Sequence, residues 1–192
     1  MRKLKLQMQI SVDGYVAGPK GELDWMTWNL DPKLLQFINA LTDSSDTILL
    51  GRKMTDGFVG YWENVVNNQP DSPEFSFARK MVETPKVVFS KTLDESKWNN
   101  TRLAKGDLVD EVTNLKKQDG KDMIVYGGAG FVSSLIQEGL IDEFNFFVNP
   151  IMINQGMRNF DLLDKRQELS LQQATAYECG IAVLTYTLLA AR

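Results

Sequence analysis

The sequence predicts an α/β protein with a mostly parallel central sheet, helices on its faces and an antiparallel hairpin at its C-terminal end. Short apolar runs that are typical of strands alternate with helical patterns through most of the chain, and this order favours parallel βαβ units. Residues 168–190 are rich in β-branched and aromatic residues around a turn near Glu178, which indicates a closing hairpin. Because 192 residues suit one folding unit, we expect a single domain over residues 1–192.

The first predicted strand covers residues 4–10, where apolar residues alternate with lysine and glutamine at the period of two that a strand requires. After a turn-rich loop, Asp31 and Pro32 predict the start of a helix, with the aspartate as N-cap and the proline at the first helical position. The apolar run 46–51 ends in glycine and predicts a buried strand. Residues 57–72 are polar and hold asparagines, glycines and a proline, so we expect the longest loop there, forming a lid or a cleft wall.

The later elements follow from the same two periodicities. We expect strands at 85–90, 101–105, 122–128 and 142–150, and helices from Pro73, over 107–118 and over 129–138.

Composition excludes several classes of function. The chain has no histidine, which excludes Ser-His and Cys-His nucleophile pairs and histidine-containing metal sites, and we expect no metal. Its net charge of −4, without a basic stretch, argues against nucleic-acid binding. The single cysteine, Cys179, forms no intrachain disulfide and suits a reducing compartment. No apolar run approaches the ~18–20 residues of a membrane span, so we expect a cytoplasmic protein.

Three predicted strand ends carry groups that suit an anion. In an open α/β sheet, ligands bind beyond the carboxyl ends of the strands. Two of these ends present cations and small residues, and the third presents glycine amides at a helix start. The residues are Gly51, Arg52 and Lys53; Ser90, Lys91 and Thr92; and Gly127, Gly128, Ala129, Gly130 and Phe131.

Neither standard phosphate motif is complete in the glycine-rich stretch. Phe131 stands where a Walker sequence has lysine, and Ser133 stands where the dinucleotide fingerprint has its third glycine. These residues therefore leave two interpretations open, a phosphate site or glycines that only permit close packing of strand and helix.

Five stretches in register resemble the dihydrofolate reductase superfamily, in particular its bacterial branch grouped with the reductase domain of riboflavin biosynthesis. They are "ISVDGYVAGPKGELDW", "ILLGRKMTDGF", "KVVFSKTL", "VYGGAGFVSSLIQEGLIDEF" and "NPIMINQGMRNFDLL". The resemblance covers nearly the whole chain and implies a dihydrofolate reductase-like fold with NADPH as cofactor. It also implies that Arg52, Ser90 and Lys91 meet the cofactor's phosphates, that residues 127–130 receive the pyrophosphate, and that Val16 and Ala17 flank the nicotinamide.

On the substrate side, the sequence departs from the pattern of dihydrofolate reductases. In the resemblance, Lys33 stands where those enzymes carry the carboxylate that binds the pterin, so folate reduction is in doubt. We expect the polar face of the first strand, Gln7 and Gln9, to face the cleft rather than solvent. Trp25 lies in a stretch that resembles the W-I-[ST] sequence of the riboflavin branch.

Four groups are candidate proton donors, each with simple packing or a structural role as the alternative: Asp13, Lys33, Tyr61 and Tyr126. Tyr61 and Trp62 would cover a flat substrate, and Tyr126 would lie near the nicotinamide. The leading hypothesis is an NADPH-dependent reductase of a small heteroaromatic or ribosylated substrate, working as a homodimer. The alternatives are 5-amino-6-(5-phosphoribosylamino)uracil reductase, dihydrofolate reductase, or a nucleotide-binding protein without turnover.

Overall fold

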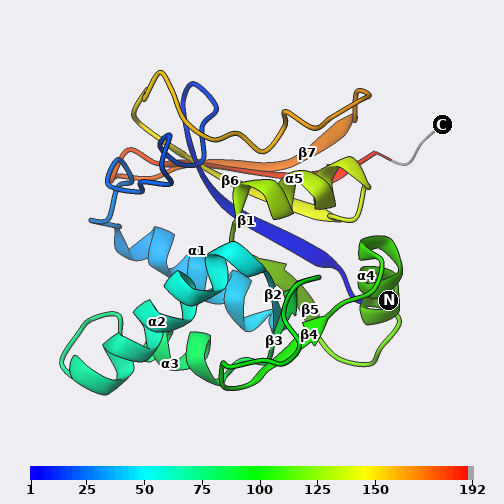
Figure 1. The fold of residues 1–192 in the computed structure, drawn as a ribbon. Coiled ribbons are helices and arrows are strands. Elements are labelled where there is room, and N and C mark those ends of the chain that lie inside the picture. Colours follow the sequence, from blue (N-terminus) through cyan, green and yellow to red (C-terminus); the bar gives the residue numbers. More distant parts are fainter. Residues whose placement is uncertain (190–192) are drawn as a thin grey trace.

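An eight-stranded sheet with strand order β4-β3-β2-β5-β1-β6-β8-β7 forms the centre of the molecule (Figure 1). The structure is a computed structural model that describes residues 1–189. The strands are β1 (Leu4–Ser11), β2 (Ser45–Gly51), β3 (Lys86–Phe89), β4 (Thr101–Ala104), β5 (Asp122–Val125), β6 (Glu143–Asn149), β7 (Leu169–Ala176) and β8 (Ala182–Leu188). The helices are α1 (Pro32–Asp43), α2 (Arg52–Asn68), α3 (Phe75–Glu83), α4 (Leu108–Lys116) and α5 (Ala129–Gln137).

The predicted fold class is confirmed. Strands β1 to β6 are parallel to one another, whereas β8 is antiparallel to both β6 and β7. The short strand predicted at 101–105 is β4, and the C-terminal hairpin is β7 and β8. Among residues 1–189, no helix is both long and apolar enough to cross a bilayer.

The two faces of the sheet are covered by different helices. Strand β1 sends Leu4, Leu6 and Met8 into a core that it shares with α4 and α5. On the opposite face, α1, α2 and α3 pack over β2, β3 and β5, around buried residues such as Ile48 and Met81. The period of two in β1 therefore separates an apolar face from a face of lysine and glutamine that lies on the α1 side.

The prediction of a loop over residues 57–72 is wrong, because α2 continues to Asn68. The apolar side chains of this segment recur at helical spacing, and the glycines at 57 and 60 are exposed, with open space beside them. Phe58 and Trp62 pack against the sheet core and α3, as the T-shaped contact of Trp62 with Phe77 at 5.2 Å shows. Burial of this face outweighs the cost of about 1 kcal/mol that each interior glycine carries. No lid exists at this position.

Capping residues define several helix boundaries as expected. The carboxylate of Asp31 accepts hydrogen bonds from the N–H groups of Lys33 and Leu34, both at 3.0 Å, so α1 begins where the Asp31-Pro32 pair predicts. Asp107 caps α4 in the same way. Helix α3 begins at Phe75, two residues after the predicted start at Pro73.

The order in which successive strands are added to the sheet changes direction between β2 and β5. These strands are neighbours, yet α2 follows β2 onto one face and α5 follows β5 onto the other. Such a switch point opens a crevice beyond the carboxyl ends of the two strands, which is where open α/β sheets bind ligands.

Candidate functional site

The carboxyl ends of β1 to β6 lie along one side of the sheet, here called the carboxyl edge. Strands β3, β2 and β5 are neighbours, so the three stretches predicted to hold an anion end up next to one another. Strands β1 and β6 continue the edge on the far side of β5. The edge is formed by the residues at or after these strand ends, namely 11–17, 51–53, 90–92, 126–131 and 149.

Two helices begin at the carboxyl edge with glycine and without a side-chain cap. Helix α2 follows Gly51 and α5 follows Gly128, and no N–H group of either first turn donates to an N-cap side chain. By contrast, aspartates cap α1 and α4. The first N–H groups of α2 and α5 therefore stay available to an anion, which the positive end of the helix dipole favours.

The glycines at this edge have different roles. A Cβ added to Gly51 would lie 2.6 Å from the Cβ of Phe131, so Gly51 permits close packing of β2 and α5. Gly128 has a φ of 88°, in the left-handed region that favours glycine. A Cβ added to Gly130 would meet no atom within 4 Å, so space adjoins the first turn of α5. Close packing thus explains Gly51, while Gly128 and Gly130 leave amides and room for a ligand.

Basic side chains stand beside these helix starts. The Nε of Arg52 is buried and has no hydrogen-bond partner, and its Nη1 lies 3.9 Å from the Oδ2 of Asp56. A buried guanidinium nitrogen without a partner is unusual and indicates that a ligand or water completes its coordination. Lys53 and Lys91 are exposed at the neighbouring strand ends.

Ser90 shapes the turn after β3. This residue is 7% exposed, and its Oγ accepts hydrogen bonds from the N–H groups of Thr92 at 3.3 Å and Leu93 at 3.2 Å. Both bonds use the oxygen as acceptor, so the hydroxyl proton can still be donated. The turn holds Lys91 and Thr92 at the surface next to α2.

A second loop fixes the segment that contains Val16 and Ala17. The N–H of Val16 donates to the C=O of Met157, and the N–H of Met157 donates to the C=O of Ala17, both at 2.9 Å. Gly156 passes so close that a Cβ there would lie 2.1 Å from the carbonyl oxygen of Ala17. This approach requires glycine, and it joins the loop after β1 to the loop after β6.

Asp13 is one of the ties between these two loops. Its carboxylate accepts from the hydroxyl of Ser11 at 2.7 Å, and from the N–H groups of Asn154 at 2.8 Å and Ile153 at 3.2 Å. The Ser11 hydroxyl is the main reason that the pKa of Asp13 lies below its ordinary value, and the two backbone bonds add to the effect. An ionised carboxylate with three donors suits the structural alternative and is a poor proton donor.

The polar face of β1 lies beneath α1 and points into the interior. Gln9 Oε1 accepts from the Nδ2 of Asn149 at 2.7 Å, and the Oδ1 of Asn149 accepts from the N–H of Thr27 at 2.8 Å. The Oε1 of Gln7 is buried without a partner. Trp25 lies in the loop that Asn149 holds, with its indole N–H donating to the C=O of Glu22 at 3.1 Å. These neutral amides form a chain from the middle of β1 to the carboxyl edge.

The sequence reasoning missed two buried asparagines at and beyond the carboxyl end of β6. Asn149 is fully buried at the end of β6, and Asn159 is 1% exposed with neither its Oδ1 nor its Nδ2 bonded. A polar residue at the carboxyl end of a buried parallel strand was a usable signal for Asn149. Nothing in the local sequence distinguishes Asn159 from a loop asparagine.

The structure turns the side chain of Tyr126 away from the carboxyl edge. Its hydroxyl lies 3.1 Å from the Oγ1 of Thr42, in the last turn of α1, and its ring stacks on Phe58 at 5.7 Å. Burial raises the pKa of this phenol well above its ordinary value. These contacts describe a packing residue, not a proton donor beside a substrate. Lys33 is exposed in the first turn of α1.

Tyr61 and Trp62 also lie apart from the strand ends, more than two turns into α2. The hydroxyl of Tyr61 donates to Glu74 at 2.8 Å, and Trp62 belongs to the core between α2 and α3. They do not cover the carboxyl edge, because the segment is a packed helix.

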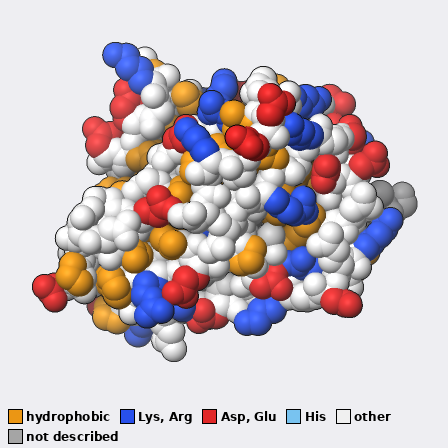
Figure 2. Space-filling view, turned by 60° about the horizontal axis from the view of Figure 1, so that its bottom comes forward, with side chains coloured by type: hydrophobic (Ala, Val, Ile, Leu, Met, Phe, Trp, Pro, Cys, Tyr) orange, Lys and Arg blue, Asp and Glu red, His pale blue; other side chains and the backbone are white. Residues whose placement is uncertain are grey.

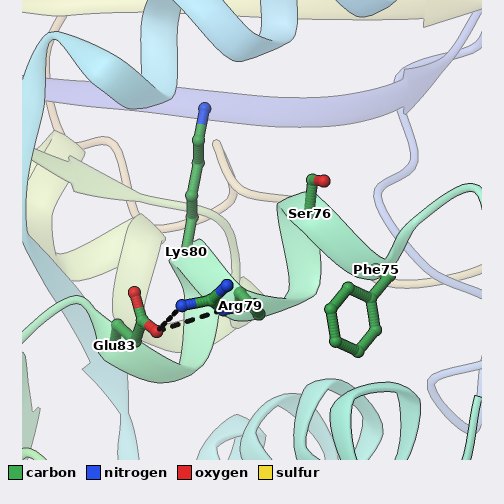
Figure 3. A pocket seen from close by; sticks show the side chains of 5 residues that line it. All are labelled: Phe75, Ser76, Arg79, Lys80 and Glu83. Carbon is green, nitrogen blue, oxygen red and sulfur yellow. Dashed lines mark hydrogen bonds and ion pairs between the residues drawn. The ribbon is translucent and has the colours of Figure 1, made fainter. Parts of the chain in front are cut away.

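Two surface hollows lie away from the carboxyl edge. One, of about 230 Å³, runs along α3 between residues such as Phe75 and Lys80, where Arg79 and Glu83 form an ion pair (Figure 3). The other, of about 470 Å³, lies at the amino ends of β3 and β4. Figure 2 shows cations and anions interspersed on the face at the bottom of Figure 1, without a single-sign patch. Neither hollow contains a predicted site residue.

A sheet of six parallel strands with a C-terminal antiparallel hairpin, and a glycine-led helix start at its switch point, defines a dihydrofolate reductase-like protein. The chain belongs to the RibD C-terminal domain family, which matches residues 2–183. The uncharacterized protein YyaP of Bacillus subtilis (strain 168) is 30% identical over 185 residues, covering 96% of this chain and 94% of YyaP.

Two solved structures share the fold over nearly their whole length. A provisionally assigned riboflavin biosynthesis protein from Shewanella sp. PV-4 superposes with a TM-score of 0.74 at 23% identity, covering 99% of this chain and 100% of that one. Dihydrofolate reductase from Enterococcus faecalis, complexed with NADP(H), superposes with a TM-score of 0.61 at 15% identity, covering 98% and 97%.

Proposed function

We propose that this protein is an NADPH-dependent reductase that transfers a hydride to a small heteroaromatic or ribosylated substrate. The observation that carries the proposal is the carboxyl edge, where two uncapped, glycine-led helix starts adjoin the unpartnered Nε of Arg52. A ligand with a pyrophosphate and a separate phosphate matches this arrangement. Membership of the RibD C-terminal domain family, and the NADP(H) complex of the E. faecalis enzyme, support this ligand over other polyphosphates.

The residues present fit the phosphates of NADPH. The amides of residues 127–131 would hold the pyrophosphate, because α5 starts there without a cap and with space beside Gly130. Gly51, Arg52 and Lys53, together with Ser90, Lys91 and Thr92, would surround the 2′-phosphate. Lys91 supplies a positive charge that an unphosphorylated ribose does not need, which favours NADPH over NADH.

The loop at Val16 and Ala17 suits the nicotinamide. Within residues 1–189, the C=O of Val16 and the N–H of Ala17 have no hydrogen-bond partner, so they offer an acceptor and a donor to a carboxamide. Bound NADPH supplies the hydride, and the chain supplies binding and orientation. The bonds of this loop to Met157 and of Asp13 to residues 153–154 hold the acceptor and donor in place.

The substrate would bind along the neutral amides between β1 and α1. The Oε1 of Gln7 is a buried acceptor without a partner within residues 1–189. Gln9 and the Asn149 that donates to it lie between Gln7 and the carboxyl edge, beside the loop of Trp25. The sheet-facing side of α1 carries no carboxylate: its buried residues are Leu34, Ile38, Leu41 and Thr42. A neutral ring with an amide-like edge suits these groups. A pterin that needs an ionic contact does not suit these groups. We therefore favour a pyrimidine of the riboflavin type over dihydrofolate as the substrate.

Nucleotide binding without turnover is the second candidate, and one observation favours it. Asp13 lies at the edge but is held as a carboxylate, Tyr126 is turned away and Lys33 is exposed, so no side chain predicted to donate a proton is both at the edge and protonated. In a reductase with this site, water would deliver the proton.

Calorimetry and turnover assays together test the proposal. NADPH should bind, and at 100 times its Kd it should raise the free energy of unfolding by about 2.7 kcal/mol. NADPH oxidation should then follow when pyrimidine or pteridine metabolites are added. Binding without oxidation across a broad panel would favour the second candidate, and absence of binding at millimolar nucleotide would overturn both.

A Lys91→Ala variant tests the assignment of the 2′-phosphate. It should weaken NADPH by about tenfold and NADH much less, because the charge-assisted bond is lost only for the phosphorylated ribose. Lys117→Ala, on the amino side of the molecule, serves as the matched control. Equal weakening of both nucleotides by Lys91→Ala would contradict the assignment.

A further inference from the structure

Asp56 lies one turn into α2 and is contacted by three positive or donor groups. Its Oδ1 accepts from the ammonium of Lys97 at 2.8 Å and from the indole N–H of Trp98 at 3.1 Å. Its Oδ2 lies 3.9 Å from the Nη1 of Arg52. The bond from Lys97 is the main cause of a pKa below the ordinary value for an aspartate, so the group is a carboxylate at neutral pH.

These contacts join two walls of the carboxyl edge. Arg52 opens α2, whereas Lys97 and Trp98 belong to the segment between β3 and β4 that also holds Lys91. This segment has neither helix nor strand between residues 90 and 100, so side-chain contacts position it. The Lys97 ammonium lies 5.2 Å from the centre of the Trp98 ring, which keeps both donors together at the carboxylate.

The carboxylate therefore neutralises Arg52, which belongs to the proposed phosphate site, and also Lys97, a further cation on the segment that holds Lys91. We propose that Asp56 is a specificity-determining residue that competes with the 2′-phosphate of the cofactor for Arg52 and Lys97, and so limits the preference for NADPH over NADH. The inference rests on the proposed function. Because a 2′-phosphate carries close to two negative charges, it is repelled by Asp56 about twice as strongly as a singly charged group at the same distance.

Two substitutions separate this charge effect from a merely structural role. Asp56→Asn removes the charge but retains an oxygen that can accept from Lys97 and Trp98, whereas Asp56→Ala removes both the charge and the acceptor. Glu83→Gln is the matched control: Glu83 also pairs with an arginine four residues away on an exposed helix, with 2.9 Å between Arg79 Nη2 and Glu83 Oε1, but it lies on α3 (Figure 3).

The test measures the Kd of adenosine 2′,5′-bisphosphate, NADPH and NADH by calorimetry for the full chain. Asp56→Asn should tighten the bisphosphate and NADPH by about fivefold to tenfold at low salt and NADH by less than about twofold, with the gain shrinking at about 0.5 M salt. Asp56→Ala should tighten the bisphosphate and NADPH less than Asp56→Asn does, because the segment around Lys97 also loses the acceptor that positions it. Glu83→Gln should change none of the three constants.

The outcomes distinguish this inference from the proposed function. If the unaltered protein binds NADPH, but Asp56→Asn leaves its affinity unchanged or weaker while circular dichroism shows an intact fold, Asp56 is only a structural tie and the inference is overturned. If the unaltered protein binds none of the three ligands, the proposed function fails and the inference fails with it.

Discussion

The two ends of the parallel strands differ in whether their buried polar groups have hydrogen-bond or ion-pair partners. At the amino edge, formed by the starts of β1 to β6 and the residues that contact them, buried cations are paired. Arg2 pairs with Asp46, the Nζ of Lys5 lies 2.9 Å from Asp122, and that of Lys116 lies 2.6 Å from Asp142. Asp122 and Asp142 also accept from the N–H groups of Lys3 and Leu4, at 2.8 and 2.7 Å.

At the carboxyl edge, buried polar atoms are left without partners. They include the Nε of Arg52, and two helix starts nearby have no cap. Gln7 Oε1, part of the amide chain that leads to this edge, is a further example. The Oγ of Ser45 is an exception at the other end, at the start of β2. Unpaired buried groups lower stability, and the ligand of the proposed function would complete those near the carboxyl edge. On that proposal, the amino edge serves stability and the carboxyl edge serves binding.

The largest effect is expected at the amino edge. Asp142→Ala leaves the ammonium of Lys116 and the N–H of Leu4 without their acceptor, and should lower the free energy of unfolding by about 2–3 kcal/mol, since Asp142 is partly exposed. Urea titration measures the loss, and Asp142→Asn should lose less because its oxygen still accepts from Leu4. NADPH affinity should not change. A large loss of NADPH affinity in folded Asp142→Ala would contradict the separate roles of the two edges.

At the carboxyl edge, Arg52→Gln should show the opposite pattern. NADPH should bind about thirtyfold more weakly, equivalent to about 2 kcal/mol, because a charge-assisted phosphate contact is lost. The free energy of unfolding should change by less than about 0.5 kcal/mol, since the one ion pair that Arg52 forms within residues 1–189 is exposed and long. Parallel calorimetry and urea titration of the same protein sample test both statements. Strong destabilisation would show that Arg52 supports the fold.

Lys86 provides a pH test of the amino edge. This residue is 2% exposed, its Nζ donates to the C=O groups of Val82 and Thr84 at 2.9 and 2.8 Å, and burial lowers its pKa to about 8. Between that value and the ordinary 10.5, the unfolded chain binds more protons than the folded one, so stability should rise with pH across this window.

The expected rise is between about 1 and 2 kcal/mol, because the two carbonyl bonds favour the charged form and offset part of the burial cost. Urea titrations near the two ends of the window measure it, and Lys86→Met should remove it. A variant with the same pH dependence as the unaltered protein would assign the effect to other groups.

A small stability effect, opposite in sign to that of Asp142→Ala, is expected for Gln7. Gln7→Leu replaces a side chain whose buried Oε1 has no partner within residues 1–189 with an apolar one of similar size, and should raise the free energy of unfolding by about 1 kcal/mol. The same change should abolish turnover of the substrate while NADPH affinity remains. Gln173→Leu, on the exposed part of β7, is the control. Destabilisation by Gln7→Leu would mean that a water already satisfies the oxygen.

Local sequence patterns were sufficient for most of the fold. The alternation of residues 4–10, the Asp31-Pro32 start and the glycines after β5 each specify an element through interactions within a few residues. Helix α2 was missed because its glycines and asparagines favour a loop, and only packing of Phe58 and Trp62 against α3 and the sheet outweighs that preference. The candidate anion-binding residues could be named from the sequence because a strand end is a topological position that sequence order reveals.

The sequence by itself determined the order of strands and helices, the family resemblance, and the three strand ends that meet at the carboxyl edge. Only the tertiary structure decided which side chains face that edge. It turned the hydroxyl of Tyr126 toward Thr42, tied Asp13 to residues 153–154, and joined Asp56 to Lys97 and Trp98. The physical reason is that element type depends on local periodicity, whereas the direction and partners of a side chain depend on residues far away in the chain, whose distances only the folded chain fixes.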